Sequence, residues 1–511
     1  MLNKTFSAAL TGIEAVPVEI EVNASGHGEQ DFVSIVGLPD AAVRESRERV
    51  KSALISSGYA HPAGATLINL APADMKKEGS AFDLPIALCL IAATEELPEQ
   101  TLKQSLILGE LALDGTLRPV RGVLPIALMA RKFSRIHTLI VPSANIQEAA
   151  VAAADCRVYP VEHLSQAVAV LQGKGEALAP SAAEKLFGEP DWSGLPDFAD
   201  VKGQQTAKRA LEIAAAGGHN VLFCGPPGSG KSMLAKRLSG ILPAMTEEET
   251  LETSKIHSIL GLLEADMPLL KTRPFRSPHH TVSDAGLLGG GIDPRPGEIS
   301  LAHNGVLFLD ELPEFKRNVL EVLRQPLENG VVTISRASGS FTFPCRFLLL
   351  AAMNPCPCGH LGDRQHQCRC RAAQIQQYRS RISGPLLDRI DLHVEVASLT
   401  EEELIHAPAG ESSAVIRQRV IKAREIQNER FKNTGNFSNA RMEPAQILKH
   451  CVLSPKLQGL LRHAITEFGL SARAYDKILR VARTIADLAG EEQISQAHLF
   501  EAISFRSLDR R

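Results

Sequence analysis

A glycine-rich stretch in the middle of the chain constrains its fold more than any other feature. The apolar run at residues 221–224 has the length of a buried strand, and a helix-forming segment occupies residues 233–238. Glycines between a strand and a helix let backbone N–H groups approach an anion, and the helix N-terminus adds partial positive charge. The order therefore predicts a phosphate-binding loop in an α/β domain. The loop residues are Gly225, Pro226, Pro227, Gly228, Ser229, Gly230, Lys231 and Ser232.

The residue types at the end of this loop predict how it would bind a nucleotide. We expect Lys231 to reach the terminal phosphates of ATP and the Ser232 hydroxyl to ligate Mg²⁺. A second apolar run, residues 306–309, ends in Asp310 and Glu311. Asp310 is expected to hold the Mg²⁺, and Glu311 is expected to orient and deprotonate the attacking water. The two motifs together predict phosphoryl transfer from ATP.

A third apolar run, residues 347–352, precedes Asn354. We expect Asn354 to touch the γ-phosphate or the attacking water, although asparagine after a strand is also a common turn former. Before it, residues 331–335 and 340–344 alternate around Arg336, which predicts a β-hairpin. Residues 312–325 are expected to form one helix.

The bulk composition indicates a globular protein of about three domains, because 44% of its 511 residues are hydrophobic. The net charge of −3 gives no overall attraction to nucleic acid, so such binding would need local basic faces. Residues 84–93, the longest apolar run, are half the length of a membrane span. Nine cysteines without secretory features favour a reducing cytoplasm.

Four cysteines form two close pairs in one short segment. Four thiolates predict a tetrahedral site for structural Zn²⁺, with free thiols as the alternative because C-x-C spacing is tighter than usual. Arginines between and after the pairs would give this segment a basic face for phosphates. The cysteines are Cys356, Cys358, Cys368 and Cys370, and the segment also holds His360 and His366.

The first part of the chain reads as an α+β domain. Residues 41–56 are expected to form an amphipathic helix whose arginines face solvent, DNA or a neighbouring subunit. Residues 16–22 are expected to form a strand, and Pro17 favours a position for this strand at the edge of a sheet. Residues 173–197 turn to Ala, Pro, Ser and Gly, as is typical of a linker.

Residues 109–122, with the later Leu139-Ile140-Val141-Pro142 and Lys77-Glu78-Gly79-Ser80, resemble the proteolytic domain of Lon-type proteases. The resemblance implies a Lon-protease-like, ribosomal S5 domain 2-like fold over residues 1–172. The family's catalytic lysine falls where Val123-Leu124-Pro125 stands, and its serine falls at Phe82 or Asp83. A serine without a base is not an activated nucleophile, so we expect no intact Ser-Lys dyad.

The nucleotide motifs, the hairpin before Asn354 and residues 384–391 resemble the AAA+ branch of magnesium-chelatase motor subunits and MCM helicases. This resemblance implies an AAA+ P-loop NTPase core at residues 198–397, with a Cys-rich insertion at 356–370, and a helical lid or magnesium-chelatase-like C-terminal domain at 398–511. With the Lon-like first domain, the layout is similar to the ComM/YifB competence-associated proteins.

The resemblance also implies roles for individual residues. Arg389 would be an arginine finger inserted into the neighbouring subunit's ATP, although the spacing alone favours a local ion pair. Arg473 matches the second sensor, which contacts phosphate from the lid. The insertion near Arg276 and His279, and the hairpin around Arg336, would contact DNA in a central channel.

The sequence and its resemblances together indicate an ATP-dependent hexameric DNA helicase or translocase. The implied role is branch migration of recombination intermediates when imported single-stranded DNA is integrated during natural transformation. Expected partners are single-stranded and branched DNA, further copies of the chain and recombination proteins, with no membrane. The alternative is a chelatase-like, ATP-driven protein-remodelling chaperone, and an ATP-dependent protease is disfavoured by Leu124.

Overall fold

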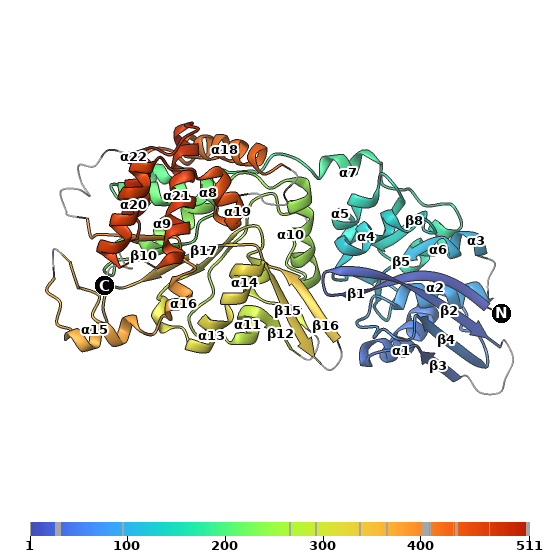
Figure 1. Ribbon diagram of the computed structural model, residues 1–511. Helices are drawn as coiled ribbons and strands as arrows, with labels where there is room; N and C mark the ends of the chain where they lie inside the picture. Colours follow the sequence, from blue (N-terminus) through green and yellow to red (C-terminus); the bar gives the residue numbers. More distant parts are fainter. Residues whose placement is uncertain are drawn as a thin grey trace. The chain divides into compact units, whose positions relative to one another are not determined.

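The chain folds into two compact units, described from a computed structural model (Figure 1). Unit 1 comprises Met1–Glu189 and Thr246–Lys271, and unit 2 comprises Pro190–Met245 and Thr272–Arg511. The structure describes residues 2–25, 32–94, 97–264, 267–291, 294–336, 339–363, 366–399, 408, 410–432, 434, 438–469 and 471–506, without the side chains of Arg336, Gly339 and Ala472.

Unit 1 is built on a mixed seven-stranded sheet in the order β3-β4-β2-β1-β5-β8-β9. β2 pairs antiparallel with β1 and β4, whereas β3 and β4, β1 and β5, β5 and β8, and β8 and β9 pair in parallel. The strands are β1 (Leu2–Thr11), β2 (Glu14–Ala24), β3 (Phe32–Val36), β4 (Ala65–Ala71), β5 (Ser105–Ile107), β8 (Thr138–Pro142) and β9 (Arg157–Val161), with the small pair β6 (Glu110–Leu111) and β7 (Leu117–Arg118).

Helices lie on both faces of this sheet. Along β8, Ile140 belongs to the hydrophobic cluster of α1, α2 and α6, while Leu139 and Val141 belong to the cluster of α4 and α5. Alternate residues of a strand point to opposite faces, so two cores form. The helices are α1 (Ala41–Ser56), α2 (Asp83–Thr94), α3 (Glu99–Lys103), α4 (Val123–Lys132), α5 (Ile146–Ala149), α6 (Leu164–Leu171), α7 (Ser181–Lys185) and α10 (Glu247–Leu260).

Two features of unit 1 differ from the expected boundaries. Helix α10, expected within the ATPase domain, packs with unit 1: the backbone N–H of Gly122 donates to the carbonyl of Ser258 (3.1 Å), and Lys255 pairs with Glu14 (2.8 Å). Part of the expected linker also belongs here, because Leu186 is buried against the α4 cluster. Leu251, Leu263 and Leu269 of the segment that contains α10 also pack with the α4 cluster, and this apolar burial explains the shifted boundaries.

Unit 2 contains a five-stranded sheet in the order β11-β14-β17-β10-β18, with every pair parallel. Its central strands are continuous apolar runs and fully buried, as is typical of a parallel sheet covered on both faces. The strands are β10 (Val221–Cys224), β11 (Phe275–Arg276), β14 (Val306–Leu309), β17 (Leu348–Met353) and β18 (Leu392–Glu395). The expected α/β class and P-loop core are confirmed.

The C-terminal helices share one hydrophobic core with this sheet and with α8, so lid and ATPase core form one unit. The helices of the unit are α8 (Gln205–Gly217), α9 (Lys231–Arg237), α11 (Asp284–Leu288), α12 (Glu298–Leu301), α13 (Arg317–Val322), α14 (Arg324–Asn329), α15 (Ala372–Arg379), α16 (Gly384–Leu387), α18 (Ser413–Arg430), α19 (Pro444–His450), α20 (Pro455–Phe468), α21 (Ala472–Ala489) and α22 (Gln496–Ser504). None of the helices in the described ranges has both the length and the hydrophobicity of a membrane span.

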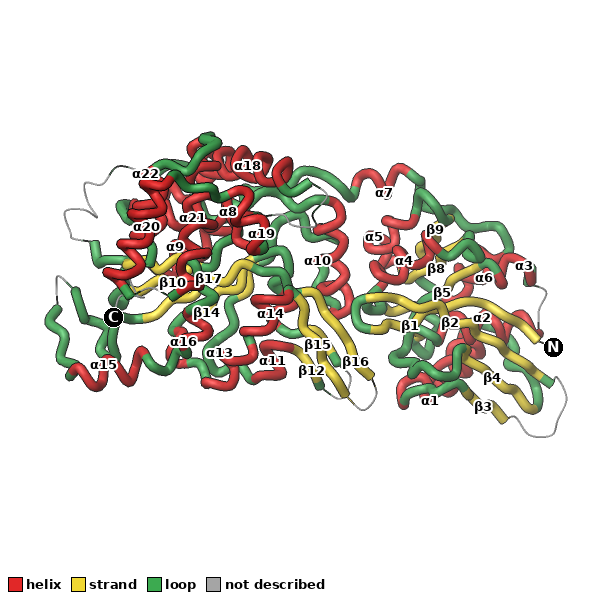
Figure 2. The backbone as a smooth tube through the Cα atoms, in the orientation of Figure 1, coloured by secondary structure: helices red, strands yellow, loops and turns green. Residues whose placement is uncertain are grey.

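Two hairpins complete unit 2 (Figure 2). The predicted hairpin is present as β15 (Val331–Arg336) and β16 (Gly339–Pro344), and a smaller one joins β12 (Gly289–Gly290) to β13 (Arg295–Pro296). The predicted single helix at 312–325 is wrong. A 3₁₀ turn at Leu312–Glu314 is followed by extended backbone at Phe315, so α13 begins only at Arg317.

Candidate functional site

The glycine-rich stretch forms the loop predicted from the sequence. β10 ends at Cys224, α9 begins at Lys231, and the loop between them turns through Gly228 and Gly230. The φ angles of these two glycines are 76° and 88°, in the left-handed region that L side chains rarely adopt. The sequence therefore folds locally into a loop whose backbone amides and following helix N-terminus suit a phosphate group.

Lys231 lies inside this loop. Its Nζ donates to the carbonyls of Gly225 (2.7 Å) and Pro226 (2.8 Å) and to Oδ1 of Asn354 (3.3 Å). Burial lowers the pKa of Lys231. The ammonium of Lys231 is thus held by oxygen atoms that follow the C-terminal ends of two parallel strands, β10 and β17. A phosphate bound there would lie close to both Lys231 and Asn354.

The second predicted motif meets the first directly. The Ser232 hydroxyl donates to Oδ2 of Asp310 (2.6 Å), and the backbone N–H of Glu311 donates to Oδ1 of the same carboxylate (2.9 Å). A hydroxyl and a carboxylate in contact are the hard oxygen ligands that Mg²⁺ takes beside substrate phosphates. Ser232 and Asp310 therefore fit the expected metal position.

Glu311 has a partner that sequence reasoning missed. Its carboxylate oxygen Oε2 lies 3.3 Å from Nδ1 of His280. The imidazole of His280 packs edge-on against Phe315, with ring centres 6.4 Å apart, and lies tilted against His279, with ring centres 4.0 Å apart. Glu311 itself has φ 52°, a conformation that is rare for a residue with a side chain. The two adjacent histidines, His279 and His280, could have drawn attention to this segment in the sequence. The contact between His280 and Glu311 depends on the tertiary structure, because the two residues are far apart along the chain.

The two arginines expected to act on phosphates each lie beside a carboxylate of their own chain. Arg389 pairs with Glu328 and donates to the carbonyl of Pro385 (2.5 Å), and it lines a cavity of about 360 Å³ at the base of the hairpin. Arg473 lies 3.4 Å from Asp388. Arg389 therefore has an anionic partner, but this partner is Glu328, 61 residues earlier in the chain, and not an aspartate of the 388–391 segment.

The predicted DNA contacts have different surroundings. Arg276 makes a two-pronged ion pair with Glu298 (2.7 and 2.8 Å), and this bonding raises its pKa, so its guanidinium already has an anionic partner. His279 is exposed and its Nδ1 lies 2.9 Å from the Thr281 hydroxyl. Arg336 ends β15, and its side chain lies outside the described residues.

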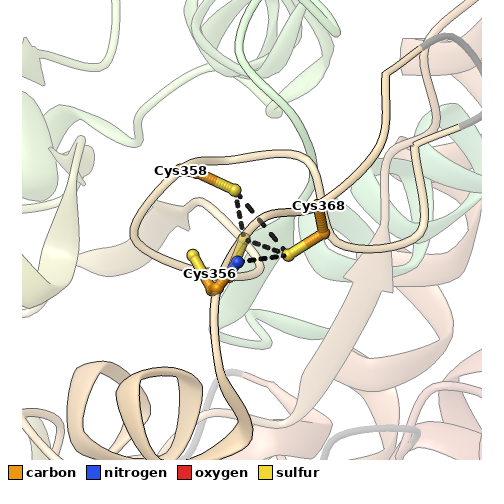
Figure 3. Close-up of side chains that lie close together, drawn as sticks. Cys356, Cys358 and Cys368 are labelled. Atoms are coloured by element: carbon orange, nitrogen blue, oxygen red, sulfur yellow. Dashed lines mark hydrogen bonds between the residues drawn. The ribbon is translucent and has the colours of Figure 1, made fainter.

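The four predicted metal-binding cysteines lie together, and the three labelled in Figure 3 point toward one another. Sγ–Sγ distances are 3.4 Å for Cys356 to Cys358 and 3.7 Å from each of these to Cys368. A tetrahedron with Zn–S bonds of about 2.3 Å has edges of about 3.8 Å, so the thiols fit such a metal. Backbone N–H groups of His360 and Arg369 lower the pKa of Cys358 to about 6, which favours the thiolate.

A buried ionic network attaches the lid to the end of β18. Oδ1 of Asp391 lies 3.1 Å from the ammonium of Lys477 on α21, and Oδ2 lies 3.3 Å from Nδ1 of His219. Burial would raise the pKa of Asp391, but Lys477 and His219 hold it well below its ordinary value. Arg473 and Lys477 are one helical turn apart, so this network fixes the helix that carries the predicted sensor arginine.

Unit 1 has other groups at the positions of the protease dyad. Leu124 is buried, and its backbone N–H donates to the Glu148 carboxylate (3.2 Å). Phe82 is buried in the core, while Asp83 accepts from Arg49 (2.8 Å). Arg49, expected on an outward-facing helix, is thus engaged inside the unit. The described geometry at these positions provides neither an activated serine nor its base.

Family comparisons cover the chain in three blocks. A family model described as magnesium chelatase, subunit ChlI, matches residues 197–404. A second, described as subunit ChlI of Mg-chelatase, matches residues 19–145, and a third, for the ChlI C-terminal part, matches residues 410–506.

Full-length relatives are similar over nearly every residue. Competence protein ComM of Haemophilus influenzae is 46% identical over 507 residues, covering 99% of this chain and 97% of the relative. YifB of Escherichia coli is 43% identical over 511 residues, covering 100% and 98%. The chloroplastic magnesium-chelatase subunit ChlI-2 of Arabidopsis thaliana is 23% identical over 357 residues, covering 64% and 78%. The chain therefore belongs to the ComM/YifB family of magnesium-chelatase-like proteins.

Proposed function

We propose that the protein is an ATP-driven DNA motor that works as a ring, most simply a hexamer. The observation that carries the proposal is the contact between Ser232 and Asp310 at 2.6 Å, which unites phosphate loop, metal ligands and Glu311 in one site. When bound, ATP with Mg²⁺ supplies the hydrolysable phosphoanhydride. Lys231 and the loop amides would bind the phosphates, Ser232 and Asp310 would hold Mg²⁺, and Glu311 would accept a proton from water.

A ring is supported by the position of two arginines. Arg473 lies 3.4 Å from Asp388, the chain neighbour of Arg389, so the two arginines lie near one another in unit 2, with the side chain of Arg473 largely exposed and that of Arg389 largely buried. Neither has a hydrogen bond or ion pair with Lys231 or Asp310 in the described part of the chain. A planar guanidinium stabilises charge on a transferring phosphate, so we assign both arginines to the ATP of an adjacent subunit.

The hairpin favours a nucleic acid over a polypeptide as the moved substrate. Its solvent-exposed face carries two cross-strand hydroxyl pairs, Thr333 with Thr342 (3.2 Å) and Ser335 with Ser340 (3.3 Å). Of the two aromatic residues of β16 that could grip a polypeptide, Phe341 and Phe343, Phe343 is fully buried and Phe341 is partly buried. Hydroxyls donate to phosphate oxygens without reading sequence, as strand translocation requires.

The proposed biological role is branch migration of recombination intermediates during natural transformation. The printed name of the Haemophilus relative, competence protein, supports a competence-related role. Single-stranded and branched DNA would be the partners, with recombination proteins, in the cytoplasm. The cysteine cluster would hold structural Zn²⁺.

Strand displacement from forked and three-stranded DNA tests the motor. We expect the native chain to release a labelled strand with ATP, and Lys231→Ala to remain folded without doing so. Unwinding by Lys231→Ala would refute the assignment. ATP turnover that no polynucleotide changes, together with a protein substrate that does stimulate it, would favour the chelatase-like remodelling chaperone instead.

A further inference from the structure

We propose that a thiophilic divalent metal bound by the four cysteines controls ATP binding, because the loop that it closes, described over residues 355–363 and 366–370, contacts the phosphate loop at Gly359. The inference rests on the proposed function only in taking the phosphate loop as an ATP site. Zn²⁺ is the metal that the thiol geometry fits.

The first connection runs through the backbone that enters the cysteine loop. Asn354 follows β17 and lies 3.3 Å from Lys231 Nζ, and Cys356 comes two residues later with its side chain fully buried. Arg379 Nε donates to the carbonyl of the intervening Pro355 (3.3 Å). Coordination at Cys356 would therefore limit the positions available to the Asn354 amide beside Lys231.

The second connection is a contact between the two loops themselves. Gly359, between the cysteine pairs, has φ 85°, and a Cβ added to it would lie 2.6 Å from Cδ of Pro227 in the phosphate loop. Its backbone N–H donates to the carbonyl of Cys356 (3.0 Å). The cysteine loop thus packs against the phosphate loop through a residue without a side chain, and the conformation of the cysteine loop limits the positions available to Pro227.

The third connection anchors the far side of the cysteine loop. The Asp363 carboxylate is buried, with Oδ2 3.1 Å from Nδ1 of His360 and 3.2 Å from Nδ1 of His366. Its other oxygen accepts from the Ser398 hydroxyl (3.3 Å), just beyond β18. Strands β17 and β18 flank β10, from which the phosphate loop emerges. The cysteine loop is therefore attached on both sides of the nucleotide site.

Metal binding would supply the energy that keeps this loop closed. The four sulfur atoms lie within 4.8 Å of one another, a crowding that thiolates tolerate when a cation neutralises them. Without the metal, only weaker contacts hold the cysteine loop closed, and the conformational entropy that the loop loses on closing is no longer offset by metal binding. We therefore expect the metal-free protein to hold Pro227 and Asn354 less firmly and to bind ATP more weakly.

The test uses the full-length chain, metal analysis and the affinity for a fluorescent ATP analogue, without DNA. We expect one Zn²⁺ per native chain, and a tetrahedral-thiolate absorption spectrum when Co²⁺ replaces it. The double variant Cys368→Ser with Cys370→Ser should lack the metal and bind the analogue at least about tenfold more weakly. Cys156→Ala, a buried cysteine of unit 1, should retain both properties.

Substitutions at two glycines of the same loop distinguish binding of the metal from the effect of the cysteine loop on the phosphate loop. Gly359 and Gly362 both have positive φ, but a Cβ at Gly359 would meet Pro227, whereas none of the described residues lies within 4 Å of a Cβ at Gly362. Gly359→Ala should keep its metal and bind the analogue about tenfold more weakly than Gly362→Ala.

Three results would overturn the inference. These are a native chain without bound metal, native-like ATP affinity in the folded double cysteine variant, and equal affinities for the two glycine variants. DNA does not enter the assay, so failure of the motor hypothesis would leave this result intact. Lys231→Ala, which should not bind the analogue, shows that the signal reports the phosphate loop.

Discussion

Oε2 of Glu311 lies 3.3 Å from Nδ1 of His280, so the residue expected to activate water is held by an imidazole from the segment after β11. A carboxylate that must accept a proton from one particular water works only in a narrow range of orientations. The side chain of Glu311 is 55% exposed, so His280 is a substantial restraint on its orientation. We therefore regard His280 as a positioning residue for Glu311.

Replacing His280 should separate turnover from binding. We expect His280→Ala to lower kcat for ATP by about tenfold while leaving nucleotide affinity nearly unchanged, because His280 pairs with Glu311, which is expected to act on the attacking water and not to bind the phosphates. Steady-state turnover and fluorescent-nucleotide binding measure the two quantities. His463→Ala, which removes an exposed histidine paired with Glu467 at 3.6 Å, is the matched control. A purely elevated KM would contradict this role.

Glu311→Gln should trap the nucleotide. The amide keeps the size of the side chain but cannot accept the proton, so we expect hydrolysis to fall by about 10²- to 10⁴-fold while ATP remains bound. Lys231→Ala should lose binding instead, since its ammonium lies inside the phosphate loop. Single-turnover hydrolysis with labelled ATP distinguishes the two variants. Native turnover by Glu311→Gln would show that another group activates the water.

The network at Asp391 should contribute strongly to the stability of unit 2. Asp391→Ala leaves Lys477 buried without its anion, and we expect a loss of about 3–5 kcal/mol in the free energy of unfolding. Urea unfolding followed by circular dichroism measures it. Asp476→Ala, a residue of the same helix α21, is the control, and a loss equal to that of this control would refute the structural role.

The same network predicts a direction for the pH dependence of stability. The pKa of folded Asp391 is depressed, so its contribution is fully present above the unfolded pKa of about 3.9 and is lost as pH falls toward the folded pKa. The difference in unfolding free energy between the native chain and Asp391→Ala should therefore shrink on acidification below about pH 4. A difference that grows there would contradict the assignment.

The hydroxyl face of the hairpin should bind DNA. Each hydroxyl contact with a phosphate contributes about 1 kcal/mol net, so Thr333→Val combined with Thr342→Val should weaken binding of single-stranded DNA by up to about thirtyfold. Fluorescence anisotropy at fixed salt measures the affinity. Thr466→Val, an exposed threonine of α20, should bind DNA as the native chain does. Equal affinities for all three proteins would remove the hairpin from the DNA path.

Unit 1 should have no peptidase activity. Leu124 and Asp83 occupy dyad positions, and the Asp83 carboxylate is bonded to Arg49. Casein or a fluorogenic peptide should survive incubation with the protein and ATP. Cleavage that persists through purification, and that a serine-directed inhibitor blocks, would show a nucleophile elsewhere in the chain. The Lon-like ancestry of this unit stays a prediction.

Features that depend on local periodicity could be predicted from the sequence. Helix α1 has the expected bounds, and the phosphate loop forms between the expected strand and helix, because apolar spacing and glycine positions act over a few residues. Pro17, expected at a sheet edge, lies on a strand that has a neighbour on each side. β2 lies inside the sheet, but Pro17 falls on a part that pairs with β1 alone, since β4 pairs with residues 19–24.

The amino-acid sequence alone specifies the chemical groups that are available: a phosphate loop, an acidic pair, four cysteines, and the arginines Arg389 and Arg473. Tertiary structure decided which groups meet. His280 contacts Glu311 and Gly359 contacts Pro227, although the members of each pair are far apart along the chain. Helix α10 packs with unit 1, although it lies within the stretch of sequence that otherwise forms unit 2. The physical reason is that packing is non-local. Burial stabilises complementary surfaces wherever the backbone brings them together, and short-range sequence patterns do not predict which surfaces will meet.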